Sequence, residues 1–213
     1  MDFKKEESGL KKFFRKFWFF LWKDDSFKGW AFSIIFLFVF IKFIFFPGLS
    51  LITGTSIPLA IVESCSMYHQ GNLFSNFNSW WQRHEDKYSG FAIDKNDFKD
   101  FPLKNGFSKG DILFIVRANP EKLEEGDIII FNANQKNPVI HRIIGMTSTE
   151  NEGIIFSTIG DNNNGQLEFE KSVTEKMLVG KAVARIAPYF GWVKLVFYDW
   201  QKPSSERGFC NEN

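Results

Sequence analysis

The longest apolar run of the chain is Trp30–Phe46, which is interrupted only by Ser33 and Lys42. Seventeen helical residues rise by about 25 Å at roughly 1.5 Å each, close to the thickness of a bilayer's hydrocarbon core. Lys42 lies near the far end, where its long stem can carry the ammonium group to the interface. Pro47 and Gly48 follow and mark the end of the run. The pattern predicts a single transmembrane anchor over residues 29–49.

Charge around this run predicts its orientation. The segment 1–28 carries a cluster of basic residues, whereas 47–82 contains no Lys or Arg. By the positive-inside bias, residues 1–28 are expected in the cytoplasm and everything after Pro47 on the outer face of the cell membrane. The aromatic and basic stretch 13–22 is too short to cross a bilayer. It predicts a helix lying in the membrane interface, with a second inserted segment as the alternative.

After Phe107 the pattern changes to short segments rich in β-branched residues. Gly, Asp and Asn clusters separate these segments at spacings typical of hairpins. The predicted strands are Ile112–Val116, Ile128–Phe131, Val139–Ile144, Ile154–Thr158 and Val179–Ile186. We therefore expect a mostly β fold, with an antiparallel and partly closed sheet.

The domain organisation follows from these two patterns. Residues 50–200 are expected to form the outer β-rich domain, and 201–213 a polar C-terminal tail. Within the domain, 70–109 is polar and aromatic without clear periodicity, which predicts an insertion between the nucleophile segment and the sheet. Its Trp80-Trp81 pair fits either a buried core or the lipid headgroup layer.

Composition excludes several functions. The formal net charge is only +1, so no global basic field favours nucleic acid. The two cysteines, Cys65 and Cys210, lack metal-ligand spacing, are not expected to form a disulfide framework, and leave the redox compartment open. His69 and His84 have no partner at metal-binding spacing and are interpreted as surface or interfacial residues. Neither a metal nor another cofactor is expected.

Three polar residues carry the candidate chemistry. Ser66 follows the apolar Ile61-Val62, His141 lies inside a predicted strand, and Asp161 opens a turn after another strand. A hydroxyl, an imidazole and a carboxylate are the parts of an activated serine nucleophile. Cys65 is a possible rival nucleophile, but its side chain should point away from that of Ser66 in an extended segment.

The order of these motifs resembles that of type I signal peptidases of the archaeal and endoplasmic-reticulum kind. The resemblance is collinear over most of residues 60–195. It rests on the following segments: Val62 to Met67, Gly110-Asp111, Gly126-Asp127 to Phe131, Val139 to Gly145, Gly160 to Asn163, and Gly180 through Gly191.

The resemblance implies roles for individual residues. Ser66 would be the nucleophile, His141 the general base, and Asp161 the carboxylate that orients His141. Ser64 would help hold the oxyanion, and Met67 belongs to the same substrate-binding segment. The chain departs from the family where a proline is usual two residues after Met67, and at Leu167, where many members have a second acidic residue. Glu168 is the neighbouring candidate for that acid.

The function implied is that of a membrane-bound serine endopeptidase that removes signal peptides from exported preproteins. Substrates would lie extended along a strand edge with small side chains in shallow pockets. Partners would be preproteins, the lipid bilayer and the export machinery. Two alternatives stay open, namely an inactive membrane-tethered binding module of the same fold and a self-cleaving protease of the repressor type.

Overall fold

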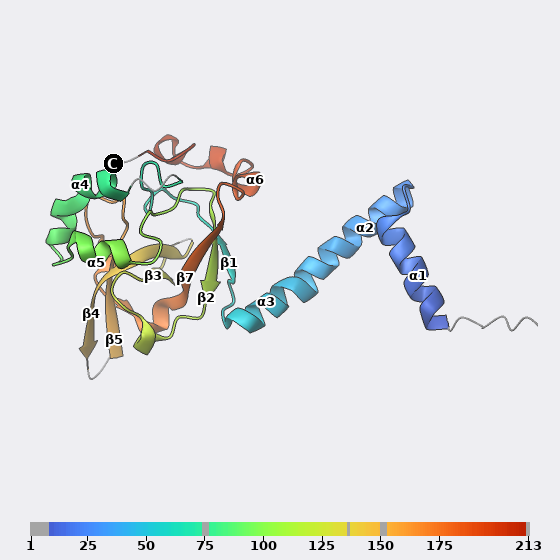
Figure 1. The fold of residues 1–213 in the computed structure, drawn as a ribbon, viewed down its shortest axis with the longest axis horizontal. Coiled ribbons are helices and arrows are strands. Elements are labelled where there is room, and N and C mark those ends of the chain that lie inside the picture. Colours follow the sequence, from blue (N-terminus) through green and yellow to red (C-terminus); the bar gives the residue numbers. More distant parts are fainter. Residues whose placement is uncertain (1–8, 74–76, 136, 150–152, 212–213) are drawn as a thin grey trace, which may run out of the picture. The chain divides into compact units, whose positions relative to one another are not determined.

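A computed structural model of the 213-residue chain describes residues 9–73, 77–135, 137–149 and 153–211. The chain divides into two compact units, Met1–Ile52 and Thr53–Asn213. The first unit is helical and the second contains the sheet (Figure 1).

The apolar run forms a helix that is longer than expected. It begins after the N-cap Ser26 and continues through α2 (Phe27–Phe40), a π-helical turn (Ile41–Phe45) and α3 (Phe46–Thr53). These 27 residues are long and apolar enough to cross a membrane. The helix therefore does not end at Pro47. Proline lacks an N–H donor and crowds the preceding turn, and a widened π turn is a common way for a helix to absorb that defect.

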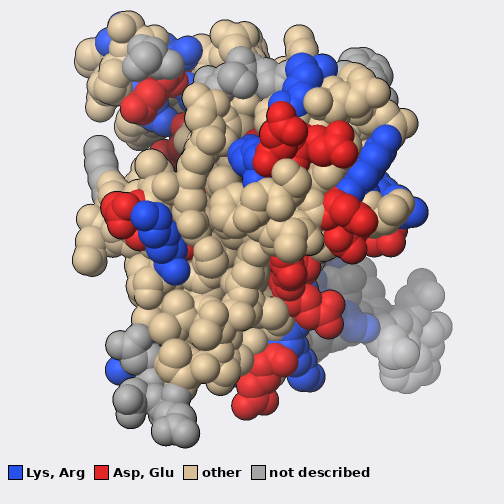
Figure 2. Space-filling view, turned by 90° about the vertical axis from the view of Figure 1, so that its left-hand side faces the viewer, with Lys and Arg blue, Asp and Glu red and all other residues tan. Residues whose placement is uncertain are grey.

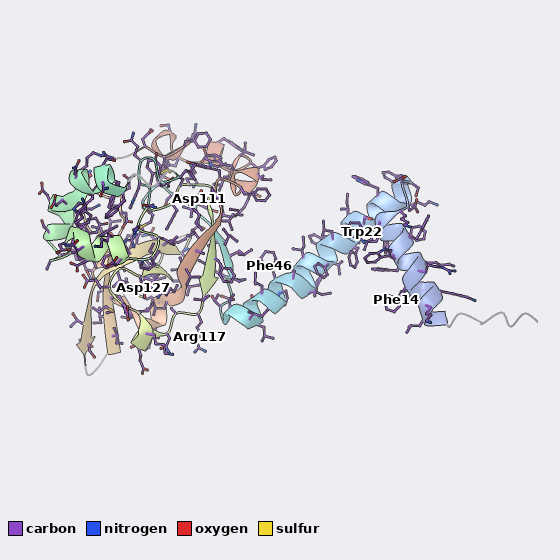
Figure 3. The ribbon with its side chains drawn as sticks, viewed as in Figure 1. Phe14, Trp22, Phe46, Asp111, Arg117 and Asp127 are labelled. Atoms are coloured by element: carbon purple, nitrogen blue, oxygen red, sulfur yellow. A yellow bond between two sulfur atoms is a disulfide. The ribbon has the colours of Figure 1, made fainter. Side chains whose placement is uncertain are left out.

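The basic aromatic stretch before this helix is also helical, as α1 (Gly9–Trp22). Its Phe17 ring contacts Phe32 and Phe36 of α2, with ring centroids 5.7 and 5.2 Å apart. The Ser33 hydroxyl donates to the carbonyl of Leu21 at 3.0 Å. Figure 3 shows that many aromatic side chains of both helices project outward. The position of α1 relative to a bilayer remains a prediction.

The second unit is built on a seven-stranded sheet whose paired strands are all antiparallel. Its strand order is β1-β2-β7-β3-β4-β5-β6, and it curls into a half-barrel. This architecture confirms the predicted fold class. The strands are β1 (Leu59–Ile61), β2 (Ile112–Val116), β3 (Ile128–Phe131), β4 (Val139–Thr149), β5 (Gly153–Ile159), β6 (Val173–Thr174) and β7 (Leu178–Ala187).

The insertion contains two helices that periodicity did not predict, α4 (Phe77–Ser89) and α5 (Lys95–Asp100). Helix α4 buries only three of its residues, so it lacks the broad apolar stripe that identifies a helix in sequence. Trp80 and Trp81 are 0% and 1% exposed, which places both in the core rather than in a headgroup layer. The local signal for α5 was its capping box between Asp94 and Asp97.

The C-terminal part of the chain is tied to the sheet unit. After β7 come α6 (Trp192–Leu195) and two short 3-10 turns, Asp199–Gln201 and Ser204–Glu206. Cys210 then forms a disulfide with Cys65, which corrects the expectation of no disulfide framework, because the fold brings together two cysteines 145 residues apart. The described part of the expected polar tail is therefore covalently attached to the segment that precedes Ser66.

Charges on the face in Figure 2 are mixed in sign, with uncharged residues over its central part. This face carries no basic field of the kind that binds nucleic acid.

Candidate active site

Ser66 lies in a turn that continues from the edge strand β1. The Val62 N–H donates to Asp111 O at 2.9 Å, and the Gly110 N–H donates to Val62 O at 2.8 Å. The chain then turns, with the Tyr68 N–H donating to Cys65 O at 3.1 Å. Residues 62–68, called here the nucleophile turn, are thus held at their start by backbone pairing to the segment before β2.

The side chain of Met67 anchors this turn. It is 1% exposed and belongs to a core cluster with Val62 and residues of β2 and β3. Its sulfur also lies 3.4 Å from the backbone nitrogen of Asp161. The Met67 side chain therefore packs inside the domain, and its contribution to substrate binding remains a prediction.

The hydroxyl groups of the two serines of the turn lie close together. Ser66 is half-buried, and its Oγ lies 3.1 Å from the Oγ of the exposed Ser64. Within the described residues, this is the only hydrogen bond of the Ser66 hydroxyl. Cys65 has no free thiol because it is bonded to Cys210. That disulfide removes Cys65 as a rival nucleophile.

His141 lies on β4, opposite Ile129 of β3, and is 4% exposed. Its Nδ1 pairs with the carboxylate of Glu170, which is fully buried. The second oxygen of Glu170 accepts the Leu167 N–H at 2.6 Å. A carboxylate on Nδ1 favours the tautomer that leaves Nε2 free to accept a proton, which is the state a general base needs.

Asp161 is engaged elsewhere. It accepts bonds from Arg142 (2.7 Å to Nη2), from the Tyr88 hydroxyl (2.8 Å) and from His69 Nε2 (2.9 Å). His141 and Arg142 are neighbours on β4, and successive side chains of a strand point to opposite faces. A carboxylate that binds Arg142 is therefore on the wrong side to orient His141. These contacts do not support the predicted Asp161–His141 pair.

Sequence reasoning missed Glu170 and considered Glu168 in its place. The Glu168 side chain is 89% exposed and pairs with Lys171 at 2.6 Å. Glu170 is the third residue of the 3-10 turn Glu168–Glu170, and it turns inward to cap Leu167. The available signal was weak, namely an acidic residue three positions after Leu167.

Comparisons with known proteins find signal peptidase catalytic subunits among the relatives of the chain. Over 106 residues the chain is 29% identical to the proteins of Homo sapiens and Mus musculus named signal peptidase complex catalytic subunit SEC11C. The match covers 47% of this chain and 55% of each relative, so the chain spans about half the length of these curated relatives. No family model matches the chain.

A longer match supports the same relationship. The chain is 25% identical over 160 residues to the catalytic subunit SEC11 of Zygosaccharomyces rouxii, covering 72% of the chain and 73% of the relative. The chain is a relative of the endoplasmic-reticulum type of type I signal peptidase. The predicted resemblance to that branch is confirmed.

In this signal peptidase relative, electrostatics indicate a structural role for the buried His69. Burial opposes the charged form of Asp161, but Arg142 and His69 hold the pKa of its carboxyl well below the usual range. Burial lowers the pKa of His69 to about 4, despite its bond to Asp161. The His69 ring stacks on Trp80 with centroids 3.6 Å apart. His69 is thus a core residue and not the expected surface histidine, and it is a poor proton acceptor.

Other polar side chains near Asp161 and His69 also have structural roles. Burial, followed by the charge of Asp161, raises the pKa of Tyr88 well above its ordinary value, so its hydroxyl stays a donor. The half-buried His84 also stacks on Trp80, with ring centroids 4.5 Å apart. Over the described residues, no group of three or more His, Cys, Asp or Glu side chains could hold a metal ion.

The buried His69 predicts a pH-dependent stability. Its pKa is 6.5 in the unfolded chain and about 4 when folded, so between these values the unfolded state binds the extra proton. Stability should therefore fall by about 3 kcal/mol as the pH drops through this window. Urea unfolding of the full chain in detergent at pH 7.5 and 4.5 measures the effect. In His69→Gln most of this loss should disappear, and an unchanged pH dependence would contradict the assignment.

Proposed function

We propose that the chain is a membrane-bound serine endopeptidase that cleaves signal peptides from exported preproteins. The observation that carries this proposal is the paired Ser64–Ser66 hydroxyls and the His141–Glu170 pair in a relative of signal peptidase catalytic subunits. Nucleophile, base and base-orienting carboxylate are the three groups that serine proteolysis requires.

The reaction would follow the usual acyl-enzyme course. His141 Nε2 takes the proton of Ser66 Oγ as that oxygen attacks the scissile carbonyl. Ser64 and backbone N–H groups stabilise the oxyanion. His141 then protonates the leaving amine, and water hydrolyses the acyl-enzyme. Within the described residues no hydrogen bond joins Ser66 to His141. Such catalytic bonds are often long without substrate and tighten on binding.

The place of β1 favours an extended substrate. It is the first strand in the sheet order, pairs with β2 on one side only, and leads directly into the nucleophile turn. A peptide could add to this edge through backbone hydrogen bonds, and alternate side chains would then enter pockets beside Ser66. This fits a signal-peptide end with small residues near the cleavage site.

The proposed location is the cell membrane, with residues 1–28 in the cytoplasm and the sheet unit outside. The 27-residue apolar helix supplies the anchor, and the basic residues before it favour this orientation. The Cys65–Cys210 disulfide is independent support, because such bonds persist mainly in oxidising compartments. Lipid and the export machinery are the proposed partners beyond the preprotein.

The decisive experiment incubates the purified full chain in detergent with a preprotein. Cleavage at the signal junction is the expected result. No cleavage of any protein would favour the binding-module alternative, and cleavage of the chain itself alone would favour the repressor-type protease.

The orientation has its own test. A tag placed after Asn213 should be digested by external protease in intact cells, because the described C-terminal residues belong to the unit that follows the anchor. A cytoplasmic reporter protein serves as the control for cell integrity. Digestion of the tag only after lysis would overturn the proposed topology.

A further inference from the structure

The segment that follows β7, residues 191–211, folds back toward Ser66 and is called here the C-terminal strap. It starts where the Gly191 N–H donates to Gly110 O at 2.7 Å. Further along, Lys202 Nζ donates to the backbone oxygen of Glu63 at 2.5 Å. It ends at the disulfide between Cys210 and Cys65, the residue directly before Ser66. Three points along the strap thus connect to the nucleophile turn or to the segment paired with it.

A buried cation fixes the course of the strap. Lys109 is 1% exposed, and its ammonium group pairs with Asp199 and donates to Glu206 O at 2.7 Å. The Trp192 indole donates to Lys109 O at 3.0 Å. An ammonium in the interior is costly without its partners. If the strap moved away, the buried ammonium of Lys109 would lose its partners Asp199 and Glu206. This penalty specifies the position of the strap.

One side chain joins the strap to the nucleophile turn. The backbone N–H of Asn162 donates to Ser66 O at 2.7 Å. Its side-chain amide donates to Cys65 O at 3.1 Å and to Asn211 O at 3.0 Å. Asn162 therefore binds the carbonyl groups of Cys65 and Ser66 and also the end of the strap.

The turn has little room to adjust around this bond. A Cβ on Gly160 would lie 2.8 Å from Ser66 O, so the Gly160 backbone packs directly against that carbonyl. With Met67 fixed in the core, the backbone of Ser66 is held from three directions: by Asn162, by the core and by the disulfide at Cys65.

From these contacts we infer that the C-terminal strap is a positioning element for the nucleophile, and that its disulfide makes catalysis dependent on oxidation. This inference deepens the proposed function and rests on it. With Cys65 bonded to Cys210, the backbone of Ser66 is fixed, and this limits where its hydroxyl can lie relative to His141. A dithiol transfers two electrons and two protons to the disulfide. The S–S bond breaks, two thiols form, and the dithiol closes into its own disulfide.

The chain permits a clean test because it contains only two cysteines. We compare the oxidised full chain in detergent with the same protein reduced by dithiothreitol. Preprotein cleavage should lose about tenfold in kcat because the nucleophile is misplaced, whereas KM should stay within about twofold. Amide hydrogen exchange in peptides covering 62–68 should accelerate, and reoxidation should restore both values. Equal kcat and equal exchange in the two states would overturn the inference.

Variants separate positioning from general damage. Cys210→Ser should show the reduced kcat at once and be insensitive to dithiothreitol. Asn162→Asp, which replaces the amide donor by an acceptor facing two carbonyls, should lower kcat in the oxidised state as well. Asn211→Ala is the matched control, because among the described residues Asn211 contributes only its backbone oxygen, and the variant should behave as the wild type does.

The exchange measurement does not depend on proteolysis. If the wild-type chain cleaves no preprotein, the proposed function fails, and the exchange of 62–68 still decides whether the strap holds the turn. If cleavage occurs but reduction changes neither kcat nor exchange, only the strap proposal fails.

Discussion

Replacing Ser66 by alanine is expected to abolish preprotein cleavage, with a loss of at least about 10³-fold in kcat. In the proposed mechanism the oxygen of this hydroxyl forms the acyl-enzyme, and the neighbouring Cys65 cannot replace it because its sulfur is in a disulfide. The variant should fold normally because Ser66 is half-buried and its side chain bonds only Ser64 among the described residues. Rates of signal-peptide release in detergent measure the loss.

Ser64→Ala provides a graded comparison for this first prediction. Loss of one oxyanion donor should lower kcat by about 10²-fold, with the acyl-enzyme step still possible. Thermal unfolding of both variants should match that of the wild type. A Ser66→Ala protein that still cleaves at the signal junction would move the nucleophile elsewhere in the chain.

The second large effect concerns Glu170, the carboxylate proposed to orient the base His141. Glu170→Gln should lower kcat by about 10² to 10⁴-fold, because an amide can stabilise the wrong tautomer of His141 and cannot stabilise its cation. Glu168→Gln is the matched control, two residues away but exposed and paired only with Lys171 among the described residues. It should keep the wild-type rate. The measurement is again kcat for preprotein cleavage.

Asp161→Asn gives the contrasting result. It removes the partner of the buried Arg142 and His69, so the expected effect is lower stability against urea. If folded Asp161→Asn is inactive while Glu170→Gln cleaves at the wild-type rate, Asp161 is the orienting carboxylate and the present assignment is wrong. His69→Gln should keep most of the activity, whereas His141→Ala should lose it, because His69 is a core residue and a poor proton acceptor.

Local pattern was sufficient for much of the fold. The strands β2, β3, β4, β5 and β7 each contain a short segment rich in apolar and β-branched residues, which indicates a strand without tertiary information. The apolar anchor was likewise predicted from a local pattern, namely the length of the apolar run. Its end was misplaced because proline is a strong local stop signal, whereas the helix continued through it with a π-helical turn.

Short elements depended on their neighbours. Strands β1 and β6 have only three and two residues, and they exist because β2 and β5 offer them free edges. Helix α4 buries few residues and gave no clear period. The local conformational preferences of such segments are too weak to predict their structure, which tertiary pairing and packing therefore decide.

Residue type and order along the chain were enough to propose Ser66 as nucleophile and His141 as base, because only a few side chains can perform those steps. The sequence could not assign the carboxylate, since Asp161 and Glu170 differ by which face of β4 they meet, and that depends on the paths of two turns after β5. Nor could it predict the disulfide, because Cys65 and Cys210 are separated by 145 residues. Which distant groups meet is set by the three-dimensional path of the chain, and that path decided how Ser66 and His141 are held.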